Sequence, residues 1–205
     1  MPMTRPSCKI CRRVKEKLFL KGERCHTAKC ALDKRNMAPG NKMSKPSKLS
    51  EYGRRLREKQ KLRFFYGVTE KQIRLFFAAA SRKKGVTGYN LLSMFERRLD
   101  NVVFRLKLAK SRKEARQLVK HGHFRLNAKK MDIPSHVLSI GDVISIHPSS
   151  AELFNIGLAK LKEQGCPSWL DFNESEKIVK VIQEPERQHI DVPVEEHLIV
   201  EYYAK

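Results

Sequence analysis

The stretch RRLDNVVFRLKLAKSRKEARQLVKHGHFRLNA, residues 97–128, decides the fold. Apolar residues up to Leu106 recur at three- and four-residue steps, which predicts an amphipathic helix over residues 90–107. Ser111 and Glu114 have the spacing of a capping box, so a second helix is expected to begin there and to end near Gly122. The apolar spacing then shortens, which is typical of strands. We expect these strands at residues 124–126, 131–133 and 143–146, with a turn at Asn127-Ala128.

The rest of the chain predicts more helix and one more strand. Further helices are expected at residues 50–63, 69–84 and 149–165, and a further strand at 177–182. Ser50 and Thr69 are the expected N-caps of the first two of these helices, because acidic residues follow both in the first turn. The apolar run at 198–203 is expected to pack onto an earlier domain.

The charge of the chain is large and uneven. The 205 residues hold 43 Lys and Arg against 22 Asp and Glu, a formal net charge of +21. Residues 1–130 hold 37 basic and 9 acidic residues, or +28, whereas residues 131–205 hold 6 and 13, or −7. About 2–8 charges suffice for the solubility of a small domain, so this excess indicates a polyanion partner. With no membrane-length apolar run and no signal-peptide pattern, we expect a soluble, cytoplasmic, nucleic-acid-binding protein.

Four of the five cysteines lie near the N-terminus and predict a metal module. Their spacing, Cys8-x2-Cys11-x13-Cys25-x4-Cys30, is typical of structural Zn2+ held by four thiolates. Zinc would supply folding free energy that so few apolar residues cannot. An iron–sulfur cluster, His26 as a substitute ligand, and four unliganded cysteines are the alternatives. The fifth cysteine is interpreted as a packing residue.

Two basic surfaces are the candidates for RNA contact. The first is the helix at 50–63, with Arg54, Arg55, Arg57, Lys59, Lys61 and Arg63. The second surrounds the paired helices, with Arg97, Arg98, Arg105, Ser111, Arg112, Lys113, Arg116, Lys120, His121 and His123. Any one of these side chains could simply be solvated, but their density favours neutralisation of phosphates.

The sequence shows no catalytic set, so we expect a protein that is not an enzyme. The histidines are scattered, and neither a Walker-type glycine-rich loop nor a paired-carboxylate motif is present. An RNA-modifying enzyme would need a catalytic domain, and the flanks of residues 91–147 are too short for one. An RNA-binding translational regulator and a zinc-finger nucleic-acid-binding regulator remain alternatives, although the helix after Cys11 has no evident base-reading set.

Several runs resemble one known family. They are SEYGRRLREKQKL at 50–62, RRLDNVVFR at 97–105, SRKEARQLVKHGH at 111–123, IPS at 133–135 and IVEYY at 199–203. In order along nearly the whole chain, they resemble the family of bacterial small-subunit ribosomal protein four. The four cysteines resemble its zinc-carrying branch.

The resemblance implies a function and a set of partners. The family binds the five-way junction in the 5′ domain of 16S ribosomal RNA, as a primary binder that nucleates assembly of the small subunit. Its members contact small-subunit protein five, lie near the site where mRNA enters, and contribute to translational accuracy. Neither a membrane nor a homo-oligomer is implied, and the expected location is the ribosome.

The resemblance also implies an α+β fold in three parts. The first is the four-cysteine zinc module with its basic linker, residues 1–45. The second is a helical domain, residues 46–90, completed by residues 184–205. The third is an inserted α/β RNA-binding domain, residues 91–183, with its core at 91–147 and a small, mainly antiparallel sheet.

Two positions depart from the family pattern. Ala128 follows Asn127 where the family commonly has Gly, and Lys107 stands where Gly is common. Because alanine tolerates a positive φ poorly, we expect the turn at Asn127-Ala128 to be looser or of another type.

Overall fold

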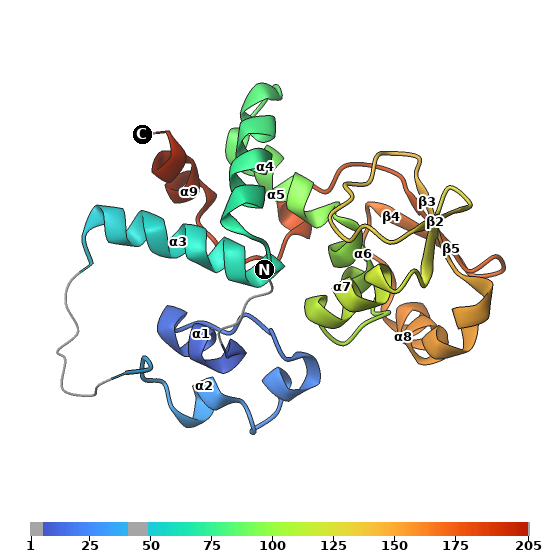
Figure 1. The fold of residues 1–205 in the computed structure, drawn as a ribbon, viewed down its shortest axis with the longest axis horizontal. Coiled ribbons are helices and arrows are strands. Elements are labelled where there is room, and N and C mark those ends of the chain that lie inside the picture. The colour runs from blue at the N-terminus through green and yellow to red at the C-terminus, as the bar shows by residue number, and fades with distance from the viewer. Residues whose placement is uncertain (1–5, 41–48, 205) are drawn as a thin grey trace. The chain divides into compact units, whose positions relative to one another are not determined.

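The computed structural model describes residues 6–40 and 49–204 (Figure 1). Parts of the predicted zinc module and basic linker, residues 1–5 and 41–48, lie outside the described residues. Contacts divide the chain into two compact units, Met1–Leu91 with Val192–Lys205, and Leu92–Asp191. In the described ranges, no helix has the length and apolar character needed to cross a membrane.

The first unit is helical. Its elements are α1 (Ser7–Val14), the 3-10 helix η1 (Gly22–His26), α2 (Ala31–Lys34), α3 (Glu51–Tyr66), α4 (Glu70–Arg82), the start of α5 (Thr87–Glu96) and α9 (Glu196–Tyr203). Both predicted N-caps are confirmed. The Ser50 hydroxyl accepts a hydrogen bond from the Gly53 amide, and Thr69 forms a complete capping box with Gln72.

The C-terminal helix packs within this unit, as the apolar run at 198–203 predicted. Helix α9 lies beside α3 (Figure 1). The Ile199 side chain is fully buried, and the Tyr203 hydroxyl donates to Glu70 at 2.8 Å. The pKa of Tyr203 is raised above its ordinary value by burial and by this carboxylate. The two ends of the chain therefore supply one helical core.

The second unit joins helices to one antiparallel sheet. Its helices are α6 (Leu99–Arg105), α7 (Arg112–Lys120), the 3-10 helices η2 (Pro148–Phe154) and η3 (Arg187–His189), and α8 (Asn155–Gln164). Its strands are β1 (Phe124–Leu126), β2 (Lys129–Met131), β3 (Val143–Ile146), β4 (Leu170–Asn173) and β5 (Ile178–Val181), in the order β2-β1-β3-β5-β4. The α+β class and the antiparallel sheet are confirmed. The sheet extends past the predicted core, because β4 and β5 pair onto β3.

The predicted single helix over 90–107 is wrong. The chain ends α5 at Glu96 and restarts at Leu99, because Arg98 takes an extended conformation. Arg98 forms an isolated antiparallel bridge with Val137, and the Leu99 amide donates to the His136 carbonyl at 2.8 Å. Local periodicity continues through this point, but a pairing with residues nearly forty positions away interrupts the helix.

The expected helix from Ser149 begins instead as a 3-10 helix. The α-helical part starts at Asn155 and stops at Gly165, which has a φ of 71°. Ile156 of α8 is 75% exposed. Leu161 and Phe154 are buried as core residues.

The turn between β1 and β2 keeps the tight two-residue form. Leu126 pairs with Lys129, so Asn127 and Ala128 are the whole loop. Their φ values are 47° and 67°, the signs that a type I′ turn requires. The Asn127 amide group also bonds to Asp142 and to the Val143 amide, both at 2.9 Å. The expectation of a looser turn is therefore wrong, and Ala128 accepts a left-handed conformation.

Replacing Ala128 by glycine should stabilise the second unit by about 0.5–1 kcal/mol. A left-handed conformation costs a residue with a Cβ about 1–2 kcal/mol, and glycine avoids this cost. The greater conformational freedom of glycine in the unfolded chain offsets part of the gain. Urea unfolding followed by the fluorescence of Trp169, the single tryptophan of the chain, measures this unit. The control is Ala159→Gly in the exposed part of α8, which should lower stability by about 1 kcal/mol. Equal losses at both positions would show that Ala128 is unstrained.

Candidate nucleic-acid interface

The basic residues of α3 do not form one exposed row. Lys59 and Lys61 are buried, and Arg55 pairs with Glu51 at 3.3 Å and with Glu201 at 2.8 Å. Arg54 is exposed, and Arg57 and Arg63 are partly exposed. The prediction of an RNA-facing helix is therefore corrected for Lys59 and Lys61, whose ammonium groups are held inside the first unit.

Each buried lysine of α3 has acidic partners. The Lys59 ammonium lies 2.9 Å from Glu70 and over the Tyr202 ring. The Lys61 ammonium lies 2.9 Å from Glu58, 3.0 Å from Glu16 and 2.9 Å from the Pro193 carbonyl oxygen. Burial alone would lower the pKa of Lys61, but the two carboxylates outweigh it and raise that pKa.

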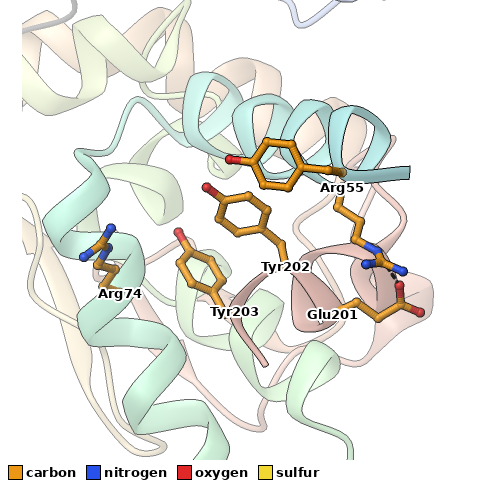
Figure 2. Close-up of a pocket in the computed structure, with 6 residues that line it drawn as sticks. Arg55, Arg74, Glu201, Tyr202 and Tyr203 are labelled. Atoms are coloured by element: carbon orange, nitrogen blue, oxygen red, sulfur yellow. Dashed lines mark ion pairs between the residues drawn. The ribbon is translucent and has the colours of Figure 1, made fainter. Parts of the chain in front are cut away.

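Figure 2 shows a pocket beside these pairs in the first unit, lined by Tyr52, Arg55, Arg74, Glu201, Tyr202 and Tyr203. The Tyr52 and Tyr202 rings lie 5.8 Å apart. The Arg55–Glu201 ion pair closes one side of the pocket. The lining consists of three tyrosines, two arginines and one glutamate.

Three arginines predicted for the second surface are internal. Arg97 donates to the Leu138 carbonyl at 3.1 Å and pairs with Glu184 at 3.2 Å. Arg98 makes a two-point ion pair with Asp100, and Arg105 makes one with Glu96. Their assignment as RNA contacts is corrected, because each guanidinium is occupied by protein partners within the second unit.

The exposed cations of the second surface lie on α7. Lys113, Arg116 and Lys120 are spaced three and four residues apart and therefore share one face, with exposed His121 at its end. Ala115 and Val119 occupy the buried face of the same helix. We call Lys113, Arg116, Lys120 and His121 the α7 cationic face.

The remaining predicted residues of this surface are partly buried. The Ser111 hydroxyl accepts a hydrogen bond from the Glu114 amide, so Ser111 is an N-cap, as its motif predicted. The Glu114 carboxylate bonds to the Lys110 amide instead of closing the box. His123 lies 2.8 Å from the Ser150 hydroxyl. Arg112 bonds to Asn101 at 2.8 Å.

One cation near this face escaped sequence reasoning. A Cβ built on Gly122 would lie 2.3 Å from the Lys130 side chain, so Lys130 of β2 crosses the turn that follows α7. Lys130 is exposed and comes beside Gly122 only because the hairpin folds back. The turn at Asn127-Ala128 was the sequence signal that could have predicted this position, because a two-residue turn returns β2 along β1 toward Gly122.

The four N-terminal cysteines lie at the centre of a small fold. Cys11, Cys25 and Cys30 are buried, Cys8 is partly buried, and all have free thiols. Burial raises the pKa of Cys11, and the charges of Cys25, Cys8 and Cys30 raise it further. His26, the alternative ligand, stacks on Phe19. Thiolates are suitable ligands for Zn2+, yet among the described residues no three His, Cys, Asp or Glu side chains are arranged to hold a metal ion. The zinc module stays a prediction.

Comparison with known proteins covers both units. Residues 2–96 match the family described as Ribosomal protein S4/S9 N-terminal domain, and residues 97–144 match the S4 domain. Proteins called small ribosomal subunit protein uS4 from Acetivibrio thermocellus and Ruminiclostridium cellulolyticum are 51% and 50% identical over 204 residues, 98% of this chain and of each relative. A relative from Pelobacter propionicus is 50% identical over the same length. These are ribosomal proteins and not enzymes, and the chain belongs to the family of small ribosomal subunit protein uS4.

Proposed function

We propose that this protein binds 16S ribosomal RNA through its second unit and is a structural constituent of the small ribosomal subunit. The observation that carries the proposal is the α7 cationic face, which the fold presents on a helix anchored by buried residues. Phosphate neutralisation there supplies affinity through counterion release. The folded shape of the RNA supplies specificity, because the deep A-form groove excludes side chains.

The family resemblance extends this proposal to particular partners. It supports a primary binding role at the five-way junction of the 5′ domain, early in assembly, and a contribution to translational accuracy. It also supports contacts with small-subunit protein five and a place near the entering mRNA. Cell fractionation tests this proposal: the protein should sediment with the small subunit.

Removing the cations of the α7 face should weaken RNA binding steeply and reduce its salt dependence. In the variant K113A/R116A/K120A, the slope of log affinity against log salt should fall by about 2–3, because each phosphate contact contributes about 0.7–0.9. Filter binding to naked 16S RNA at several salt concentrations measures this slope.

The control removes three charges elsewhere on the second unit. K160A/K177A/K180A changes exposed lysines and should leave the slope within one unit of wild type. Footprinting on the same RNA should show protection of one junction. Protection scattered over any duplex would contradict the specific function. In a parallel footprint on a messenger leader, protection there with none on 16S RNA would favour the translational regulator.

We propose separately that Cys8, Cys11, Cys25 and Cys30 hold one structural Zn2+. The burial of the thiols and the zinc-type spacing of the four cysteines support this proposal. A Zn2+ ion held by four thiolates would stabilise a segment that has only a small apolar core. With four protein ligands, the ion would have no open position for catalysis.

Metal analysis of the purified protein should find about one zinc per chain, and C11S or C25S should abolish it, since a structural site needs four ligands. The matched control is C166S, which removes a thiol of the second unit and should retain the metal. A chelator should increase hydrogen exchange only in the N-terminal segment. Iron with visible absorbance would identify a cluster instead, and full protection without any metal would contradict the proposal.

A further inference from the structure

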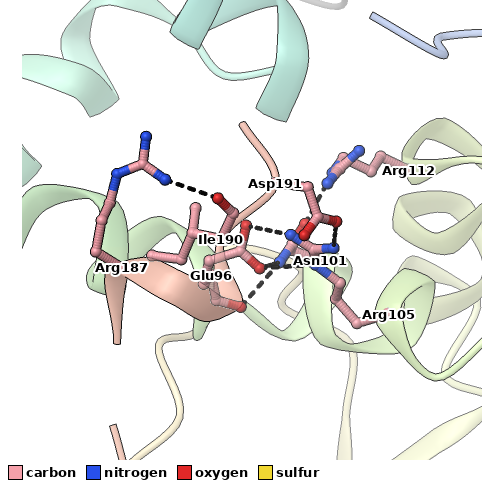
Figure 3. A network of polar contacts seen from close by, with 7 residues as sticks. All are labelled: Glu96, Asn101, Arg105, Arg112, Arg187, Ile190 and Asp191. Carbon is pink, nitrogen blue, oxygen red and sulfur yellow. Dashed lines mark hydrogen bonds and ion pairs between the residues drawn. The ribbon is translucent and has the colours of Figure 1, made fainter. Parts of the chain in front are cut away.

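A chain of hydrogen bonds leads from the interior of the second unit to the start of α7 (Figure 3). Its innermost member is Glu96, the last residue of α5, whose side chain is 0% exposed. Arg105 at the end of α6 grips both carboxylate oxygens, with Nε at 2.9 Å and Nη2 at 3.0 Å, and also pairs with Asp191. Burial alone would lower the pKa of Arg105, but Glu96 and Asp191 raise it. The Glu96 carboxylate is therefore a fixed acceptor.

Asn101 of α6 transmits this fixed geometry. It is 1% exposed, and its Nδ2 group donates to the Glu96 carbonyl at 2.9 Å and to the Glu96 carboxylate at 2.8 Å. Because Nδ2 has two acceptors on Glu96, the amide has one orientation. Its carbonyl oxygen Oδ1 must then point away from Glu96, and there it accepts a hydrogen bond from Arg112 Nε at 2.8 Å.

Arg112 is consequently held at two points. Asn101 binds its Nε, and its guanidinium lies 4.4 Å from the centre of the Phe104 ring. A guanidinium has its donors in a fixed planar fork, so fixing Nε directs the far edge of the plane. Figure 3 shows Arg112 reaching Asn101 from the side opposite Glu96. Arg112 is partly exposed and adjoins Lys113 of the α7 cationic face.

We infer that Asn101 is a positioning residue for RNA binding, which holds Arg112 ready to contact a backbone phosphate. The inference rests on the proposed RNA-binding function and adds to it a residue that orients an RNA-contacting side chain. Orientation before binding spares the loss of rotamer freedom on binding, an effect worth about two- to tenfold in affinity. Arg105, which the sequence analysis interpreted as an RNA contact, thus acts indirectly: it fixes Glu96, which fixes Asn101, which orients Arg112.

A double-mutant cycle tests the inference on the full chain, with a transcript of the 5′-domain junction of 16S RNA as the probe. N101A should weaken binding about two- to tenfold in the wild-type background. In an R112A background it should change affinity less than about twofold, because there is no guanidinium left to orient. In a K120A background, the matched control on the same helix, N101A should have its full effect.

A second variant keeps the test decisive if N101A does not fold. R112K changes only a partly exposed side chain and keeps its charge, but lysine lacks a planar group that one edge can fix and the other edge can use. R112K should lose affinity about two- to tenfold while the salt slope stays within about half a unit of wild type.

The outcomes separate the two proposals. Equal effects of N101A with and without Arg112, or wild-type affinity of R112K, would overturn the positioning role and leave the proposed function standing. Failure of the wild-type protein to bind the transcript would overturn the proposed function and the positioning role together. Coupling between Asn101 and Arg112 alone supports the inference, since a general loss of structure would act equally in all three backgrounds.

Discussion

Replacing Arg98 by alanine should lower the free energy of unfolding of the second unit by about 3–5 kcal/mol, the usual effect of removing one partner from a buried ion pair. The Arg98 side chain is 0% exposed, and its Nε and Nη2 lie 3.0 and 2.6 Å from the two oxygens of Asp100. Alanine would leave the Asp100 carboxylate buried with only Arg116, at 3.8 Å, nearby. It would also empty the volume of a large side chain where the α5–α6 break pairs with Val137.

Urea unfolding followed by Trp169 fluorescence measures this loss, because Trp169 is buried in the core of the same unit. The matched control is Arg116→Ala on α7. That side chain is exposed, so its removal should change stability by less than about 0.5 kcal/mol while weakening RNA binding. The opposite pattern, with R98A fully stable and deficient only in RNA binding, would restore Arg98 to the RNA surface.

Replacing Lys61 by alanine should destabilise the first unit by about 2–4 kcal/mol, somewhat less than a fully buried pair because one of its partners, Glu16, is partly exposed. The Lys61 ammonium connects three segments of the chain: α3 through Glu58, the N-terminal segment through Glu16, and the C-terminal segment through the Pro193 carbonyl. Glu58 in turn accepts a hydrogen bond from the Glu195 amide just before α9. Loss of the ammonium would leave the buried Glu58 carboxylate without this cation.

Hydrogen exchange read by mass spectrometry is the suitable measurement, since the single tryptophan lies in the other unit. K61A should raise exchange in α3, in residues 192–196 and in α9. K61M restores the packing of the stem without the charge, and separates the two contributions. Arg54→Ala, at an exposed position of the same helix, should leave exchange unchanged. Unaltered exchange in K61A would mean that the ammonium contributes nothing to the core.

The structural roles of Arg98 and Lys61 were not predicted from the sequence, whereas several local features were. The caps at Ser50 and Thr69, the strand at 143–146 and the position of the turn at Asn127-Ala128 were predictable, because each depends on residues within a few positions of one another. The tight form of that turn was not predicted. The break at Arg98 and the position of β4 were not, because both depend on pairing with distant segments.

The same distinction applies to the charges. A sequence shows that Lys59, Lys61 and Arg105 are cationic, but not that carboxylates from other segments pair with them. The exposed α7 cationic face was predictable, since Ala115 and Val119 mark the opposite side of the helix. The position of Lys130 near the end of α7 was not predictable, because it depends on the β1–β2 hairpin.

Motifs, caps and net charge are local or summed properties, so the sequence alone was enough to predict the family, the α+β class, the N-caps at Ser50, Thr69 and Ser111, and a polyanion-binding surface. Only the tertiary structure decided which cations face outward and which brace the interior. The reason is that exposure and ion pairing are set by chain segments far apart in sequence: Asp191 reaches Arg105, and Glu16 reaches Lys61.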